Sequence, residues 1–143
     1  MRKLLLSALL ITGFAAPVSA QATSDTTALP ADMRAARAVL AAAYEKLDAA
    51  AAASSFAPDA AIDFQGQLIS GRDGVAAWFS EAFAGITALR GGTASYVIGD
   101  GEVTERSSYI AVPTGGEEQT GTSETVWRRQ PDGTWKVARL IVH

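Results

Sequence analysis

The chain has 143 residues, of which 48% are hydrophobic and 19% charged, enough for one domain with its own core. Its net charge of −3 argues against a nucleic-acid partner. With no cysteine and His143 as the single histidine, disulfides, thiol nucleophiles and thiolate metal sites are excluded. A Ser-His-Asp triad or multi-histidine zinc site is nearly excluded as well. We therefore expect neither a metal nor a cofactor.

Residues 1–20 have the pattern of a signal peptide. Arg2 and Lys3 precede an apolar run from Leu4 to Phe14, and small residues follow up to Ala20. The run is shorter than the roughly 20 residues that a transmembrane helix needs. We expect cleavage after Ala20 and a periplasmic or secreted protein without membrane contact, the alternative being a buried N-terminal helix.

The next segment predicts a short leader and then a long helix. Residues 21–30 are small and polar, which favours a flexible leader, so we place the domain at 31–143. Asp32 is expected to cap a helix that runs to about Ser55. Its apolar side chains recur every three or four residues and form one buried face: Met33, Ala36, Leu40, Tyr44 and Leu47. The alanine run 49–53 continues this helix, with a disordered segment as the alternative.

The rest of the chain predicts a hairpin, a second helix and a meander. After a turn at 56–59, residues 60–64 and 67–70 form a hairpin around Gln65-Gly66. A helix from 71 to about Ala84 shows helical spacing of Val75, Trp78, Phe79 and Phe83. From Thr93 the period is two, with turns at 99–101, 114–116 and 131–133. These turns join four antiparallel strands at 93–98, 102–112, 118–129 and 134–142. The order indicates an α+β domain, with helices on the concave side of a curled sheet.

This order, together with three segments, resembles the nuclear transport factor 2-like superfamily. The segments are FAPDAAIDF at 56–64, GRDGVAAWF at 71–79 and VWRRQPDGTWK at 126–136. Within the superfamily, the chain is most similar to the SnoaL-like group and to domain of unknown function 4440. The resemblance covers 31–143 and implies a cystatin-like cone, in which a curved antiparallel sheet wraps around N-terminal helices and leaves a pocket at one end.

The resemblance also implies which side chains line that pocket. Besides Val75, they are the ligand-binding candidates Leu40, Tyr44, Phe64, Phe79, Phe83, Tyr96, Ser123, Thr125 and Trp127. Trp135, beyond the next turn, is expected to lie outside it. Apolar and aromatic walls with a few hydroxyls are typical of a site for a small apolar molecule. The alternative is that the same side chains fill a core.

The resemblance places no strong catalytic residue. Isomerases of this superfamily hold a carboxylate base in the pocket, and matching through Pro58-Asp59-Ala60 puts that position at Phe64, which cannot take a proton. Asp63 is a weak candidate, because strand alternation turns it to the opposite face unless a bulge at Gln65-Gly66 re-aims it.

Other polar positions favour no catalytic role either. Glu105 and Arg106 are adjacent on a strand, so only one can face the cone, and we expect solvated or cross-strand charges. Relatives often carry an acid or amide where this chain has Leu140. His143, at the chain end, is expected to be exposed.

Two functions remain open. The first is a secreted small-molecule-binding domain, with isomerase, cyclase or dehydratase activity as an extension. The second is a non-catalytic association module with a filled core. We expect a homodimer through the outer sheet face, where Glu124, Val126 and Arg128 alternate with the pocket residues. A cavity of roughly 300 Å³ or more would favour the first function.

Overall fold

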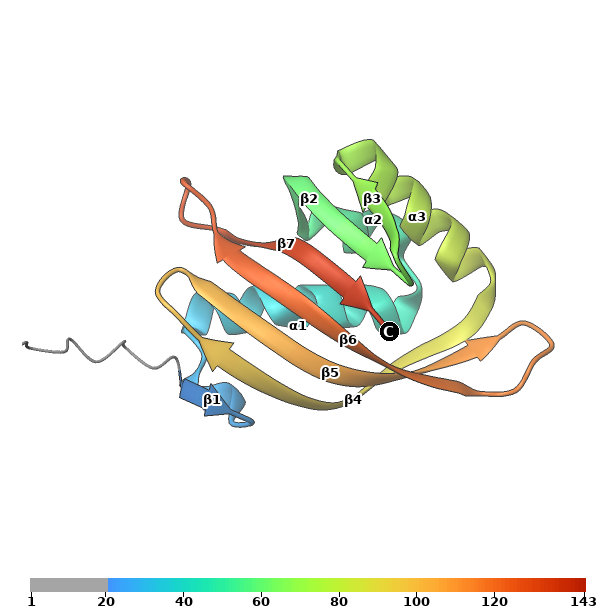
Figure 1. The fold of residues 1–143 in the computed structure, drawn as a ribbon, viewed down its shortest axis with the longest axis horizontal. Helices are drawn as coiled ribbons and strands as arrows, with labels where there is room; N and C mark the ends of the chain where they lie inside the picture. The colour runs from blue at the N-terminus through green and yellow to red at the C-terminus, as the bar shows by residue number, and fades with distance from the viewer. Residues whose placement is uncertain (1–20) are drawn as a thin grey trace, which may run out of the picture.

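A curled sheet wrapped around helices is the architecture of residues 21–143, the part of the chain that the computed structural model describes (Figure 1). The expected signal peptide at 1–20 lies outside the described residues. In chain order, the elements are β1 (Gln21–Thr23), a 3-10 turn η1 (Thr26–Ala28), α1 (Ala31–Lys46), α2 (Ala49–Ser54), β2 (Phe56–Phe64), β3 (Gln67–Ser70), α3 (Arg72–Ala84), β4 (Ile86–Ile98), β5 (Glu102–Pro113), β6 (Gln119–Arg129) and β7 (Trp135–Val142).

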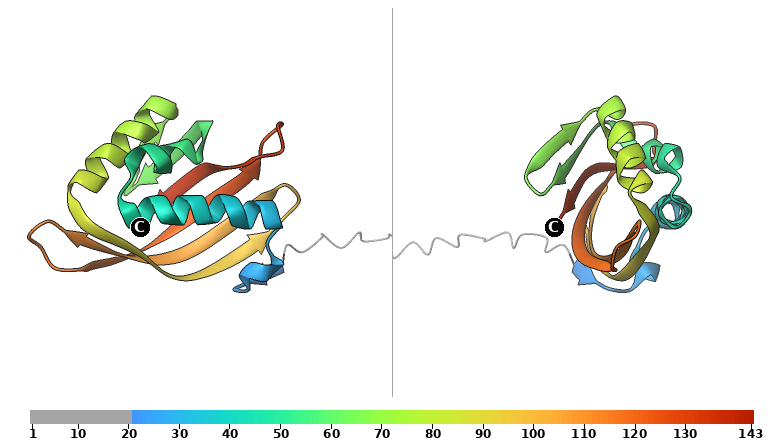
Figure 2. Two further views of the ribbon diagram at one scale, coloured as in Figure 1. Left: turned by 180° about the vertical axis from the view of Figure 1, so that it is seen from behind. Right: turned by 90° about the vertical axis from the view of Figure 1, so that its right-hand side faces the viewer.

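The described strands form one sheet in the order β1-β4-β5-β6-β7-β2-β3. The predicted meander is confirmed, since β4, β5, β6 and β7 pair antiparallel in sequence order. The sheet is not purely antiparallel, however, because β2 pairs parallel with β7. This pairing places the β2–β3 hairpin beside β7, at the opposite end of the meander from β4. Figure 2 shows the result: the sheet curves around α1, and α3 lies across the open side. The expected α+β cone is thus confirmed.

The first helix is shorter than expected, and the alanine run forms a helix of its own. Leu47 adopts a left-handed conformation, with φ 52°, which ends α1. The carboxylate of Asp48 then accepts a hydrogen bond of 3.0 Å from the backbone N–H of Ala51 and caps α2. The prediction of one helix to Ser55 is therefore wrong, and so is the alternative of disorder over residues 49–53.

Residues 21–30 are part of the domain fold and not a structureless leader. Ala22 pairs with Val97, so β1 covers the edge of β4. The Asp25 carboxylate accepts a 2.8 Å hydrogen bond from the N–H of Thr27, and Leu29 is 3% exposed in the core. The polar composition of this segment did not reveal that the edge of β4 offers it backbone hydrogen bonds.

Two strands begin earlier than their patterns indicated. β4 starts at Ile86, ahead of the expected Thr93. The pattern did not show residues 86–92 as strand because the glycines at 91 and 92 interrupt the alternation, where the register shifts. β2 starts at Phe56, ahead of Ala60, with a register shift before Ala61. The helix predicted from 71 to about Ala84 is α3, and both of its ends match the prediction. None of the helices within 21–143 has the length and apolarity that crossing a membrane requires.

The start of α1 is fastened to the β6–β7 hairpin by a small polar cluster. Asp32 accepts a 3.1 Å hydrogen bond from Nε1 of Trp135 and lies 3.0 Å from a guanidinium nitrogen of Arg129. That guanidinium stacks on the Trp135 ring, 4.9 Å from its centroid. Burial opposes the charged form of Asp32, but the Arg129 charge and the N–H donors of Trp135 and Met33 outweigh it and lower the pKa of this carboxyl.

We expect the stabilisation from Asp32 to disappear in acid. Because its folded pKa lies below the unfolded value, the contribution is complete above about pH 4 and is lost as the pH falls through the folded pKa. In urea unfolding, Asp32→Asn should therefore be less stable than the parent at pH 7, and the difference should shrink below about pH 4. Asp59→Asn is the control for the loss of one negative charge, because Asp59 is exposed and its side chain forms no hydrogen bond or ion pair with a described residue. A difference that stays constant from pH 7 to pH 3 would contradict the assignment.

Candidate functional site

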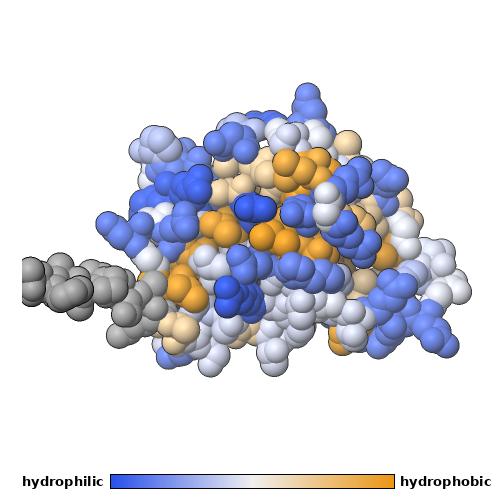
Figure 3. Space-filling view, viewed as in Figure 1, coloured by the Kyte–Doolittle hydropathy of each residue, from blue (hydrophilic) through white to orange (hydrophobic). Residues whose placement is uncertain are grey.

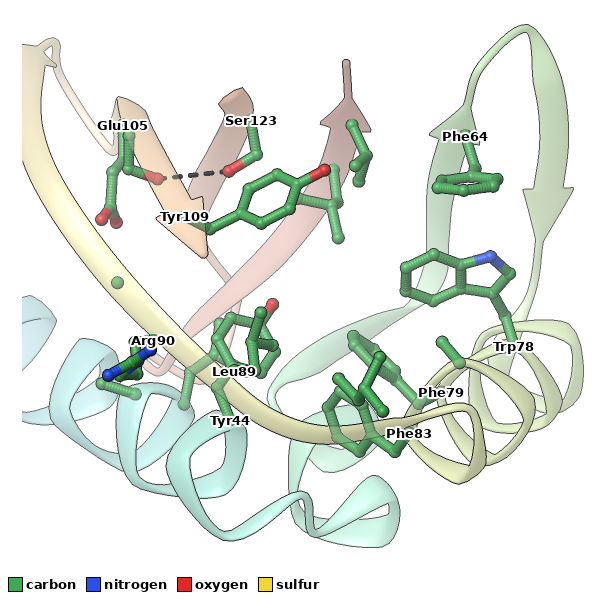
Figure 4. A pocket seen from close by; sticks show the side chains of 18 of the residues that line it. Tyr44, Phe64, Trp78, Phe79, Phe83, Leu89, Arg90, Glu105, Tyr109 and Ser123 are labelled. Carbon is green, nitrogen blue, oxygen red and sulfur yellow. Dashed lines mark hydrogen bonds between the residues drawn. The ribbon is translucent and has the colours of Figure 1, made fainter. Parts of the chain in front are cut away.

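A cavity of about 880 Å³ lies between the concave face of the sheet and the helices α1 and α3. Figure 4 looks into it: side chains of α3 and β2 stand at one end, and Glu105 on β5 stands at the other. The volume lies within the 300–1,000 Å³ that is usual for small-molecule sites. The cone is therefore not filled by its own side chains.

Aromatic rings form the wall on the α3 side. Positions 75, 79 and 83 of α3 are buried and Trp78 is partly buried, as the helical spacing requires. The Phe79 ring centroid lies 5.1 Å from that of Trp78, 5.3 Å from that of Phe83 and 6.0 Å from that of Tyr44. Phe64 on β2 extends the wall, 5.7 Å from Trp78. These contacts hold a continuous apolar surface against the cavity.

Hydroxyl groups lie along the sheet wall opposite. Ser107 and Ser123 face each other across β5 and β6 and share a hydrogen bond of 3.2 Å, the dashed line in Figure 4. The Tyr109 hydroxyl donates to the backbone oxygen of His143, at 3.3 Å. The cavity thus has one aromatic wall and one with polar groups.

The Tyr44 hydroxyl is a further polar group at this site, and Figure 4 shows it pointing into the cavity. Burial raises the pKa of Tyr44, and the nearby Glu105 carboxylate adds to the shift. The hydroxyl therefore stays protonated at any physiological pH and can donate a hydrogen bond. No hydrogen bond from it to another described side chain or backbone group is present.

An ion pair closes the end of the cavity away from Trp78. Nε and Nη2 of Arg37 donate to the same carboxylate oxygen of Glu105, at 3.0 and 2.8 Å. Trp127 Nε1 donates to the other oxygen, at 3.3 Å. Burial lowers the pKa of the Arg37 guanidinium, but its hydrogen bonds to Glu105 and the Glu105 charge outweigh this and leave the pKa raised. The Arg37 guanidinium is therefore charged in the folded protein.

The expectation for Glu105 is therefore wrong, while that for Arg106 is right. Glu105 is 7% exposed and lines the cavity. Arg106 is exposed on the convex face and pairs with Glu124 at 3.0 Å. Strand alternation could have indicated that Glu105 faces the cavity, since Val103, Glu105 and Ser107 share one face. It could not have indicated the ion-pair partner of Glu105, because Arg37 lies 68 positions away in the sequence.

The structure brings most of the sequence-predicted site residues together. Seven of the nine ligand-binding candidates line the cavity: Leu40, Tyr44, Phe64, Phe79, Phe83, Ser123 and Trp127. Trp135 is buried outside it. Contact of these side chains with a ligand stays a prediction. Lining residues that were not predicted as ligand contacts include Arg37, Ile69, Ile86, Leu89, Arg90, Glu105, Tyr109, Leu140 and Val142.

Tyr96 and Thr125 do not reach the cavity, and neither does Val75. The Arg37 guanidinium lies over the Tyr96 ring, 5.4 Å from its centroid, and covers it. Thr125 is short, and its cross-strand neighbours Glu105 and Leu140 form the wall in its place. Val75 is 1% exposed and packs in the core.

Asp63 lies on the face away from the cavity, as strand alternation indicated. Its carboxylate accepts a 3.0 Å hydrogen bond from the N–H of Gly66 and lies 3.8 Å from Arg139. Phe64, its neighbour, faces inward. His143 is exposed as expected. Within residues 21–143, no three His, Cys, Asp or Glu side chains are grouped so as to hold a metal ion.

The cone and its cavity place the protein in the class of cystatin-like, nuclear transport factor 2-like folds. Three solved structures are similar to it: a nuclear transport factor 2-like superfamily protein from Salmonella enterica, a ketosteroid isomerase-like protein from Erwinia carotovora, and a nuclear transport factor 2-like protein with a cystatin-like fold from Novosphingobium aromaticivorans. Their sequence identities are 13%, 17% and 21%, with TM-scores of 0.64, 0.61 and 0.63. Each alignment covers 78% of this chain and, in the same order, 87%, 92% and 78% of the other. Such identities show a common fold.

The family itself follows from the sequence. The model of the SnoaL-like domain matches residues 25–141, so the chain belongs to the SnoaL-like family. This confirms the resemblance inferred from its motifs. Comparison with curated proteins gives no match.

Proposed function

We propose that this protein is a secreted small-molecule-binding domain whose cavity takes a mainly apolar ligand. The observation that carries the proposal is the cavity of about 880 Å³ behind a continuous aromatic wall. It exceeds the roughly 300 Å³ that separates an open site from a filled core. The SnoaL-like family and the ketosteroid isomerase-like neighbour support a ligand site at this place in the fold. The signal-peptide pattern of residues 1–20 supports secretion.

Binding fits this site better than proton abstraction. The position of the isomerase base is held by Phe64, and Asp63 faces away from the cavity. Glu105 is a buried carboxylate of the cavity wall, but three N–H groups already donate to its two oxygens. To take a proton from a ligand, this carboxylate would have to give up one of these donors.

A blocking substitution tests the site. Ala77 is exposed on α3 and lines the cavity, so an indole added there by Ala77→Trp would enter the ligand space without disturbing the core. We expect the parent to bind the neutral dye Nile red and Ala77→Trp to bind it at least about tenfold more weakly, measured by dye fluorescence. Ala84→Trp, at an exposed position of the same helix outside the cavity, should bind as the parent does. Equal losses in both variants, or no binding by the parent, would overturn the proposal.

We further propose that the protein forms a homodimer through the convex sheet face. Figure 3 shows hydrophobic residues gathered over the middle of that side of the molecule among hydrophilic ones. Val126 lies on this face between Glu124, paired with Arg106, and Arg128, paired with Glu102. Self-paired charges around an apolar centre suit a two-fold contact. A monomer mass at every concentration in analytical ultracentrifugation would contradict it.

A further inference from the structure

The Arg37 guanidinium is held on one edge and one face, which leaves its other edge for a ligand. Glu105 occupies the edge formed by Nε and Nη2, and the Tyr96 ring covers one face. Nη1 forms no hydrogen bond with any described residue. Arg37 nevertheless lines the cavity, with 31% of its side chain exposed. Because a guanidinium is planar and its donors are arranged as a fork, Nη1 is the donor group that the pairing with Glu105 leaves unused.

The charge around this edge does not suit an anion. The charged residues of the cavity wall are two arginines and three glutamates, a surplus of one negative charge: Arg37, Arg90, Glu45, Glu81 and Glu105. Arg37 is neutralised by Glu105, and Arg90 is paired with Glu118 outside the wall. A carboxylate ligand would approach Nη1 against this surplus, whereas a neutral acceptor would not.

Near Glu105, two donors form no hydrogen bond with a described residue: Nη1 of Arg37 and the Tyr44 hydroxyl. The Glu105 carboxylate beside them already accepts three bonds. A ligand that offers an acceptor satisfies these donors, and one that offers only donors leaves them unpaired. A buried, unpaired donor costs more free energy than a hydrogen bond returns, so this arrangement discriminates between ligands.

We infer that Arg37 is the polar group of the cavity that binds the ligand, an inference that rests on the proposed function. Its partner is a neutral oxygen acceptor, such as the carbonyl of an otherwise apolar ring compound. Glu105 and Tyr96 are the positioning residues of Arg37. The aromatic wall then holds the ring system, and the carbonyl oxygen accepts from Nη1.

Three naphthalenes that differ in one substituent test this inference. They are 1-acetylnaphthalene, a neutral ketone; 1-ethylnaphthalene, which lacks the oxygen; and 1-naphthoate, an anion. Affinities are measured by displacement of Nile red. We expect the ketone to bind about tenfold more tightly than the hydrocarbon, as one charge-assisted hydrogen bond allows. The anion should bind more weakly than the ketone.

Variants assign the preference to Arg37. In Arg37→Met combined with Glu105→Gln, no unpaired charge remains and Trp127 keeps an oxygen acceptor, so the fold is retained. We expect this double variant to lose most of the tenfold preference for the ketone, with the Tyr44 hydroxyl as the unused donor that remains. Arg34→Met is the control, because Arg34 is exposed on the same helix and donates to the Thr27 carbonyl outside the cavity. It should keep the tenfold ratio.

The outcomes separate this inference from the proposed function. A ketone preference that stays tenfold in the double variant, or a parent that binds the anion best, would overturn the role of Arg37. So would a parent that binds Nile red but shows no preference for the ketone or binds none of the naphthalenes. If the parent binds neither dye nor naphthalene, it is the ligand site itself that fails.

Discussion

Replacing Phe79 with alanine is expected to lower the free energy of unfolding by about 3–5 kcal/mol, the usual cost of removing a buried phenyl ring. Phe79 is 1% exposed and its ring packs against those of Phe56, Tyr44, Trp78 and Phe83. It therefore joins α3 to α1 and β2. Urea unfolding at neutral pH measures the change.

The matched control for this variant is Ser80→Ala on the same helix. Ser80 is exposed, so the change should alter stability by no more than about 0.5 kcal/mol. Phe79→Ala should also weaken the binding of Nile red, because the aromatic wall loses its centre. A loss below about 1 kcal/mol would show that the aromatic contacts do not hold the helices together.

The second large effect is expected at the Arg37–Glu105 pair. Arg37→Met alone should cost about 2–3 kcal/mol, because it leaves the buried Glu105 carboxylate without its ionic partner. The value is set below the usual cost of breaking a buried pair, since part of the Arg37 side chain is exposed. In the double variant with Glu105→Gln, no unpaired charge remains. We expect the double variant to lose about 2 kcal/mol less free energy of unfolding than the two single variants lose together.

The control is the neighbouring pair on the other face of the same strand. Arg106 and Glu124 form an ion pair of 3.0 Å in which the Arg106 side chain is 68% exposed. A double-mutant cycle with Arg106→Met and Glu124→Gln should give a coupling below about 1 kcal/mol, as exposed pairs do. Equal couplings for the two pairs would mean that Glu105 is as well solvated as Arg106, contrary to the structure.

The sequence pattern predicted a helix or strand correctly where the structure of that segment depends on its own residues. The helical spacing of Val75, Phe79 and Phe83 predicted α3 with both ends, and the period of two predicted the four strands of the meander. Alternation also placed Asp63 outside, since it depends on backbone geometry alone. Most of the aromatic wall followed from the same periodicities once the family resemblance was seen.

Breaks and edges were not predictable in this way. The end of α1 at Leu47 depends on a left-handed residue that is not glycine, which no composition rule indicates. β1 exists because the edge of β4 has free backbone groups, and the sequence of residues 21–23 says nothing of that edge. The parallel pairing of β2 with β7 likewise joins segments that are far apart in the chain.

By itself, the sequence determined an α+β domain with most of its helices and strands, because these depend on local periodicity and on residue type. The resemblance to the SnoaL-like group added the cone and the side chains expected to line it. Only the tertiary structure decided that the cone holds a cavity and that Glu105 is a buried ion-pair partner. The reason is physical: an adjacent Glu-Arg on a strand is compatible with two solvated charges, and the Glu105 carboxylate can lie inside only because Arg37, 68 positions away, and Trp127 donate to it there.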